Sequence, residues 1–253
     1  MLIDTHAHIQ FDTYDSNRDE IIQRAQDNGV EYIVCPGIDP DSNELAIQIA
    51  EQYDNVFATV GIHPHDSEDL PEKWLQTIEE QLEHPKVVAL GEIGLDYFKE
   101  YTPKETQRRI FREQLELASS LDIPVVVHNR DSDEDMKSLM LNYGPKTGVM
   151  HCFTSDIDMA QALADTGYII SFSGIATFGN KTVTRTIREL DLSHMMVETD
   201  CPFLAPVPKR GKTNEPAFVR HTAEKVAELK SVDIDTVEKV TTENAIGLFS
   251  LPL

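Results

Sequence analysis

Short apolar runs alternate along the chain with longer segments of helical periodicity. The runs lie at residues 2–5, 32–35, 56–60, 87–90, 124–127, 148–150, 168–172 and 195–197, and their length is typical of buried strands. Between several of them, segments at 18–28, 42–53, 105–121 and 157–165 repeat apolar residues at the spacing of one helix face. Such alternation predicts parallel strands joined by crossover helices.

The number of runs favours a closed barrel. The runs match the roughly eight parallel strands of a (β/α)8 TIM barrel, and 253 residues is a usual length for one. An open doubly wound α/β sheet gives the same alternation, so the pattern leaves that architecture as an alternative. Residues 1–253 contain no internal repeat, low-complexity tract or Gly/Ser linker, and we expect them to form a single TIM-barrel domain.

Composition narrows the class of protein. With 40% hydrophobic residues, a chain of this length can bury a sizeable core. No apolar stretch approaches the roughly 18 residues of a membrane span, and no basic segment precedes an apolar one at the N-terminus, so we expect no membrane association and a cytoplasmic location. The three cysteines show no Cys-x-x-Cys spacing, which fits a reducing compartment and argues against a disulfide framework.

The net charge bears on possible partners. The chain carries 22 basic and 44 acidic residues, a formal net charge of −22 at pH 7. A field of this sign repels polyanions at long range, so the charge balance does not suggest tight nonspecific binding of nucleic acid. A phosphate-bearing substrate would have to be attracted locally.

Histidines and carboxylates recur where the apolar runs end. The first run leads into Asp4-Thr5-His6-Ala7-His8, and alternation along an extended segment places His6 and His8 on one face. Further polar residues follow the later runs: His63 and His65, Glu92, His128, His151 and Asp200. Because the carboxyl ends of barrel strands meet at one mouth, we expect these side chains to gather in space.

This set of residue types predicts a metal centre. Imidazole and carboxylate without thiolate suit Mg, Mn or Zn held for catalysis rather than a structural zinc site. There are more ligands than one cation needs, which favours two divalent cations, the arrangement used to hydrolyse phosphodiesters and amides. In the partition we expect, Glu92 bridges the cations, one of which is held by His6, His8 and Asp200 and the other by His128 and His151. Asp200 would also orient or deprotonate the attacking water.

Seven ordered segments resemble the signatures of the TatD family of metal-dependent deoxyribonucleases. They are Asp4–His8, Gly61–His65, Gly91–Tyr97, His128–Arg130, His151–Phe153, Glu198–Pro202 and Arg210–Pro216, and they extend over most of the chain. The resemblance implies an amidohydrolase-like TIM barrel and metal-dependent hydrolysis of nucleic acid at DNA ends. It also implies metal ligation by His6, His8, Glu92, His128, His151 and Asp200.

Other residues are candidates for binding the substrate. His63 and His65 resemble the substrate-side histidines of the family; His63 is expected to bind the scissile phosphate or to protonate the leaving oxygen, whereas His65 either does the same or shapes the loop after Pro64. The loop at 206–216 is expected to bring Arg210 and Lys212 to the barrel mouth, where they would bind phosphate oxygens. Arg130 would add another phosphate contact.

The predicted function is exonucleolytic hydrolysis of single-stranded or frayed DNA ends through a metal-activated water, with catalytic roles for Asp200, Glu92 and His63. No stable protein partner can be inferred. Two alternatives stay open. The first is an amidohydrolase-like hydrolase of a lactone, cyclic amide or aminoacyl ester, because the same ligands can activate water against a carbonyl. The second is a noncatalytic, metal-dependent interaction module.

Overall fold

The strands pair in the order in which they follow one another along the chain. In the computed structural model, which describes residues 1–252, eight strands form one sheet, and every neighbouring pair from the first to the last is parallel. The strands are β1 (Leu2–Asp4), β2 (Val30–Pro36), β3 (Val56–Val60), β4 (Val87–Asp96), β5 (Val125–Arg130), β6 (Gly148–Met150), β7 (Tyr168–Phe172) and β8 (Met195–Val197). A doubly wound sheet would reverse its strand order at a switch point, so the sequential order excludes that alternative.

The segments that follow β1 and β8 bring the two edges of the sheet together. Ala7 and Cys201 form a parallel bridge, the amide of Asp200 donates to the carbonyl oxygen of His6 at 2.9 Å, and the amide of His8 donates to that of Cys201 at 2.9 Å. The sheet is therefore a nearly closed barrel, and the predicted TIM-barrel fold is confirmed. This closure also places three of the predicted metal ligands side by side.

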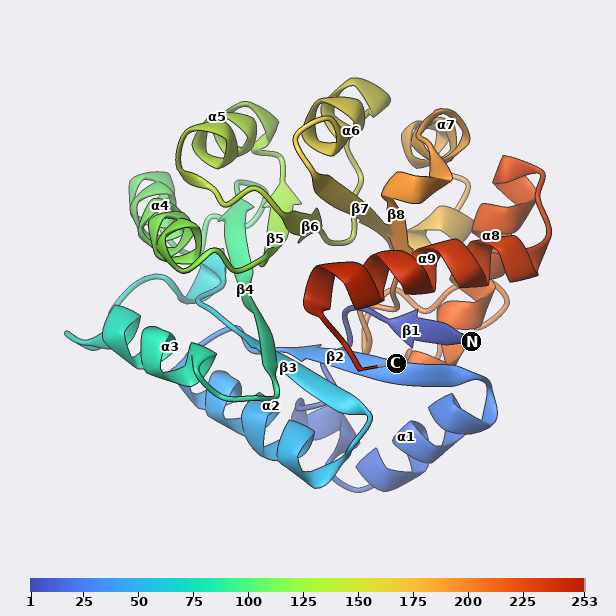
Figure 1. Cartoon of the computed structure of the whole chain (residues 1–253), viewed down its shortest axis with the longest axis horizontal. Helices are drawn as coiled ribbons and strands as arrows, with labels where there is room; N and C mark the ends of the chain where they lie inside the picture. Colours follow the sequence, from blue (N-terminus) through green and yellow to red (C-terminus); the bar gives the residue numbers. More distant parts are fainter. Residues whose placement is uncertain (253) are drawn as a thin grey trace.

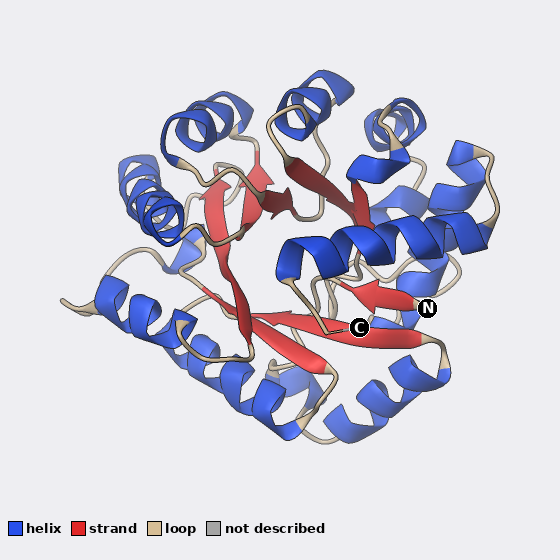
Figure 2. Ribbon diagram, in the orientation of Figure 1, coloured by secondary structure: helices blue, strands red, loops and turns tan. Residues whose placement is uncertain are grey.

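Helices form a layer outside the strands, as Figure 1 and Figure 2 show. They are α1 (Arg18–Asp27), α2 (Pro40–Gln52), α3 (Trp74–Leu82), α4 (Lys104–Leu121), α5 (Asp133–Tyr143), α6 (Ile157–Ala164), α7 (Lys181–Glu189), α8 (Val219–Lys230) and α9 (Ile234–Phe249), with short 3₁₀ turns η1 (Asp12–Tyr14), η2 (Pro64–Asp66), η3 (Gly174–Thr177), η4 (Leu192–His194) and η5 (Pro216–Phe218). The four predicted helical segments match α1, α2, α4 and α6 to within two residues at each end. Over residues 1–252, none of the helices combines the length and apolar character needed to cross a membrane.

Local side-chain caps explain where two of the predicted helices begin. The Asp39 side chain accepts a hydrogen bond from the Ser42 amide at 2.8 Å before α2, and the Asp156 side chain accepts one from the Met159 amide at 3.0 Å before α6. Each carboxylate satisfies an amide that has no partner within the helix.

The inside of the barrel is filled at its N-terminal end. One cluster joins inward-facing strand residues to α9, and it contains Ile3, Val34, Phe57, Ala89, Val126, Val149, Met196, Ala245 and Phe249. Figure 1 shows α9 lying across the strands at this end. Because apolar side chains and α9 close this end, the C-terminal end remains as the place for a cavity.

Strand β4 is longer than its apolar run predicts. It continues through residues 91–96, where Gly94 pairs with His128 of β5 and has a φ of +146°. A Cβ atom at Gly94 would lie 2.0 Å from the carbonyl oxygen of His128, so glycine permits the close pairing. As a consequence, Glu92 and His128 lie within β4 and β5, and the prediction that they follow their strands is wrong.

Candidate metal centre

The Glu92 carboxylate lies at the middle of a group of histidines and is 3% exposed. Its Oε1 atom lies 2.9 Å from Nε2 of His151 and 3.0 Å from Nδ1 of His128. Its Oε2 atom lies 3.2 Å from Nε2 of His6 and 3.5 Å from Nε2 of His8. The two oxygens thus face the two pairs of histidines that the sequence analysis assigned to separate cations.

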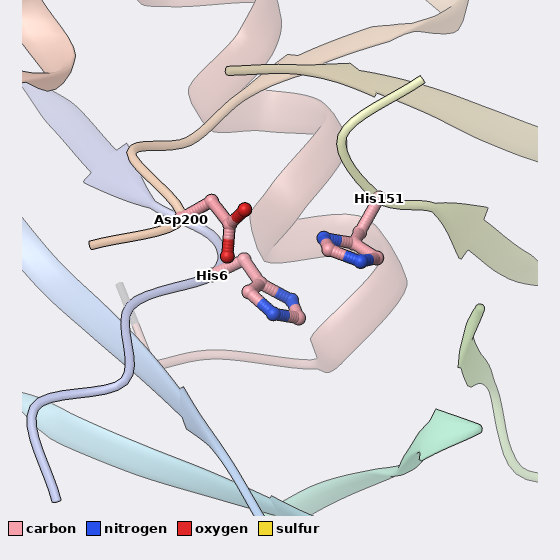
Figure 3. A group of neighbouring side chains, drawn as sticks. All are labelled: His6, His151 and Asp200. Carbon is pink, nitrogen blue, oxygen red and sulfur yellow. The ribbon is translucent and has the colours of Figure 1, made fainter. Parts of the chain in front are cut away.

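Asp200 approaches the same centre from the loop after β8. Figure 3 shows its carboxylate close to the imidazoles of His6 and His151, which extend from the segments after β1 and β6. One ligand atom from each of these three residues lies within 4.8 Å of the others, and the two rings stack with centroids 3.9 Å apart. Oδ1 of Asp200 also lies 3.7 Å from Nε2 of His8. All six predicted ligands therefore surround one centre.

The spacing of the donor atoms fits divalent cations. Nε2 of His6 lies 3.2 Å from Nε2 of His8, and Nδ1 of His128 lies 3.2 Å from Nε2 of His151. Two atoms bound to one ion at about 2.0–2.2 Å lie roughly 3–3.5 Å apart in tetrahedral or octahedral geometry. Within residues 1–252, the buried Nδ1 atom of His6 has no hydrogen-bond partner in the protein. Nitrogen and oxygen donors at this spacing can hold Mg, Mn or Zn.

Burial and charge set the protonation states of the centre. Burial would raise the pKa of Glu92, but the surrounding histidines hold it well below its ordinary value, so the carboxylate is ionised. Burial lowers the pKa of His8 to about 3 and that of His63 well below its ordinary value, so both rings are neutral. Ionised carboxylates and neutral imidazoles are the forms that bind cations.

His151 shows where positive charge is needed. Burial would lower its pKa, but Glu92 and Glu198 raise it well above its ordinary value. A proton on this ring compensates the two buried carboxylates in the absence of a cation. A cation beside Glu92 would compensate the same charge and displace that proton.

Two buried carboxylates support the histidines from behind. Oδ2 of Asp96 lies 3.3 Å from Nε2 of His128 and 3.0 Å from Nε2 of His65, and Oε1 of Glu198 lies 3.4 Å from Nδ1 of His151. Such partners fix the tautomer and orientation of a ligand imidazole. The sequence analysis missed Asp96 and Glu198 as site residues, although alternation places each an even number of residues from a predicted ligand.

A cavity of about 760 Å³ opens onto the centre. Among its lining residues are the predicted substrate-binding residues His63, His65 and Arg130, together with the aromatic residues Phe11, Phe98 and Phe203. The guanidinium of Arg130 lies 3.9 Å above the ring of Phe98, and this contact holds a positive charge at the wall of the cavity.

His63 and His65 differ in what their rings face. Nδ1 of His63 accepts a hydrogen bond from the amide of His65 at 3.1 Å, so a neutral His63 carries its proton on Nε2, which lies 3.6 Å from Oε1 of Glu92. His65 instead directs Nε2 at Asp96. His63 therefore presents a donor toward the centre, whereas His65 is engaged at the wall.

Arg210 and Lys212, which were expected at the mouth of the barrel, are exposed and do not line this cavity. The loop that carries them packs against Thr177 and Phe178 in the segment after β7. The amide of Val207 donates to Oγ1 of Thr177 at 2.9 Å, and the guanidinium of Arg210 lies 3.9 Å above the ring of Phe178. These contacts direct the loop away from the metal centre.

The chain is similar to proteins named as metal-dependent hydrolases. The metal-dependent hydrolase YabD of Bacillus subtilis (strain 168), whose name marks it as uncharacterized, is 41% identical over 99% of this chain and 100% of its own. The likewise uncharacterized metal-dependent hydrolase TatD of Mycobacterium tuberculosis is 32% identical over 99% of this chain and 98% of its own. The crystal structure of YjjV, a TatD homologue from Escherichia coli, superposes with a TM-score of 0.94 at 30% identity and covers 99% of this chain and 98% of that one.

A family model described as TatD related DNase matches residues 3–250. The match extends over nearly the whole chain and includes every residue of the metal centre. The chain therefore belongs to the TatD-related DNase family of metal-dependent hydrolases.

Proposed function

We propose that this chain is a deoxyribonuclease that removes nucleotides from single-stranded or frayed DNA ends with the help of two divalent cations. The observation that carries the proposal is that Glu92, the two histidines at its Oε1 atom, His128 and His151, and Arg130 line one cavity. Two divalent cations held by these residues would lower the pKa of a water molecule towards about 7, and their charge would offset that of the phosphate. The family model, described as a DNase, supports phosphodiester bonds as the substrate class.

The side chains divide the work of one hydrolytic step. Arg130 binds a non-bridging phosphate oxygen, because its guanidinium is a rigid donor at the cavity wall. The oxygen of a water molecule attacks phosphorus while the Asp200 carboxylate accepts a proton from that water. The bond from phosphorus to the leaving oxygen breaks, and Nε2 of His63 donates its proton to that oxygen. Throughout this step, the two oxygens of Glu92 keep the pair His6 and His8 and the pair His128 and His151 in place.

The cavity favours a strand end over an intact duplex. Its volume of about 760 Å³ lies in the range of pockets for small molecules, which admit a nucleotide more readily than a double helix. Phe203 is 54% exposed, and the centroid of its ring lies 6.1 Å from that of Phe11. An unstacked base would gain contact by packing on these rings.

The test compares linear and circular single-stranded DNA of one sequence, with metal-loaded protein and with Glu92→Gln as the inactive control. We expect the linear strand to lose nucleotides from an end and the circle to survive. Equal cleavage of both would contradict the exonuclease. A parallel panel of RNA, lactones and cyclic amides separates the classes, because hydrolysis confined to the lactones or amides would contradict a nuclease.

A further inference from the structure

The loops after β7 and β8 run side by side away from the cavity of about 760 Å³ at the candidate metal centre, named here the metal cavity. Ile175 and Leu204, one from each loop, line the cavity. A Cβ atom at Gly174 would lie 2.0 Å from the carbonyl oxygen of Leu204, which shows how closely the two backbones pack. Farther along, Val207 is hydrogen-bonded to Thr177 and Arg210 covers Phe178. The paired loops thus form a continuous wall from the cavity to Arg210.

The wall ends at a group of exposed cations. A shallow surface hollow of about 360 Å³ is lined by Lys181, Thr184, Arg185, Arg188 and Glu189 of α7 together with Gly179, the residue directly after Phe178. Arg185 is paired with Glu189 at 2.9 Å. Over residues 1–252, the side chains of Lys181, Arg188 and Arg210 form no ion pair. Although the chain has a net charge of −22, these three cations have no carboxylate partner among the described residues, and they remain free to bind an external anion.

We propose that Lys181, Arg188 and Arg210, named here the outer basic surface, bind the phosphodiester backbone of a single strand whose end lies in the metal cavity. The inference rests on the proposed function and extends it from a single phosphodiester to a polymeric substrate. Exposed cations on one surface bind a backbone without regard to base sequence. Bound there, the strand would meet less repulsion than the net charge of the acidic protein would otherwise cause.

The test measures strand length dependence with the double variant Lys181→Glu/Arg188→Glu. A matched control, Lys137→Glu/Lys146→Glu, makes the same change in charge at exposed lysines of α5 and of the segment before β6. Binding to nuclease-resistant phosphorothioate strands of about 3 and about 16 nucleotides is followed by fluorescence anisotropy over a range of salt concentrations. Hydrolysis of bis-para-nitrophenyl phosphate reports on the metal centre alone.

We expect the double variant to bind the long strand at least about tenfold more weakly than the control does, with a salt slope smaller by about 1.4 for two lost phosphate contacts. Affinity for the short strand and hydrolysis of bis-para-nitrophenyl phosphate should not change. Arg210→Glu, a second variant outside α7, should also weaken binding of the long strand.

Equal affinity of the double variant and the control for the long strand would overturn the outer basic surface. So would binding of this surface to anionic lipid vesicles without any binding of the strand. The proposed function fails separately, when the wild-type protein hydrolyses no DNA although its outer basic surface binds the long strand.

Discussion

Oδ2 of Asp96 lies 3.3 Å from Nε2 of His128, while Nδ1 of the same imidazole lies 3.0 Å from Oε1 of Glu92. A proton shared between Nε2 and Asp96 leaves the lone pair of Nδ1 directed at the centre. Oδ1 of Asp96 accepts hydrogen bonds from the amides of Phe98 and Lys99, which hold the carboxylate in place. Asp96 is therefore a positioning residue for His128.

Asp96→Asn should lower the affinity for divalent cations by about 10–100-fold. The amide oxygen can still accept from the two backbone amides, but its N–H groups would face Nε2 of His128 and move the ring proton to Nδ1. Isothermal titration calorimetry of the metal-free protein with Mn or Zn measures the change in affinity. Asp41→Asn, at an exposed position of α2, is the control and should bind as the wild type does. Unchanged affinity in Asp96→Asn would contradict the positioning role.

Glu92→Gln should reduce the rate of DNA hydrolysis by at least about a hundredfold. The substitution keeps the shape of the side chain but removes the charge that the surrounding histidines share, and it places amide hydrogens against their lone pairs. Single-turnover assays measure the rate, and circular dichroism checks the fold. A noncatalytic interaction module predicts that function survives this change, so full retention would favour that alternative.

Removal of metal should abolish activity and lower thermal stability. Cations bound at the centre stabilise the folded state, by about 2.7 kcal/mol when their free concentration is 100 times Kd. Activity and Tm are measured after chelation and again after addition of Mg, Mn or Zn singly. An identical Tm in chelated and reloaded protein, with metal analysis showing no uptake, would argue against a metal centre.

Arg130→Ala should lower kcat/KM for DNA by about 10–100-fold, because a charged hydrogen bond to phosphate is worth about 1.5–3 kcal/mol. Arg130→Lys should recover part of the loss, since it restores the charge without the planar donor. Arg112 offers a matched control: its guanidinium also lies over an aromatic ring, 5.9 Å from that of Tyr143, but Arg112 does not line the cavity. Equal losses for Arg130→Ala and Arg112→Ala would remove Arg130 from substrate binding.

Two glycine substitutions should change stability in opposite directions. Gly94→Ala places a methyl group against the backbone of β5 at a φ of +146° and should lower the free energy of unfolding by at least about 2 kcal/mol. Gly247→Ala, in α9, meets no atom within 4 Å and should raise it by about 0.5–1 kcal/mol. Urea unfolding measures both. Stabilisation by Gly94→Ala would show that close pairing of β4 and β5 does not require glycine.

The sequence alone determined the alternation of strands and helices and the six predicted ligands at the strand ends, whereas the strand order of the tertiary structure decided between a barrel and an open sheet. Apolar runs and helical segments alternate along the chain, and parallel strands joined by helices bring their carboxyl ends to one mouth. For this reason the sequence predicts that His6 and Asp200, which are far apart in the chain, lie close together in space. Their meeting depends on topology, which the order of local patterns records.

Only the tertiary structure decided how side chains outside the strands are directed. Asp96 supports His128 because β4 continues past its apolar run, and a charged residue at the end of a strand carries no sign of that extension. Arg210 lies away from the cavity because its loop packs on Thr177 and Phe178, residues from another part of the chain. Loop conformation follows from such long-range contacts, whereas strand and helix periodicity follows from neighbouring residues.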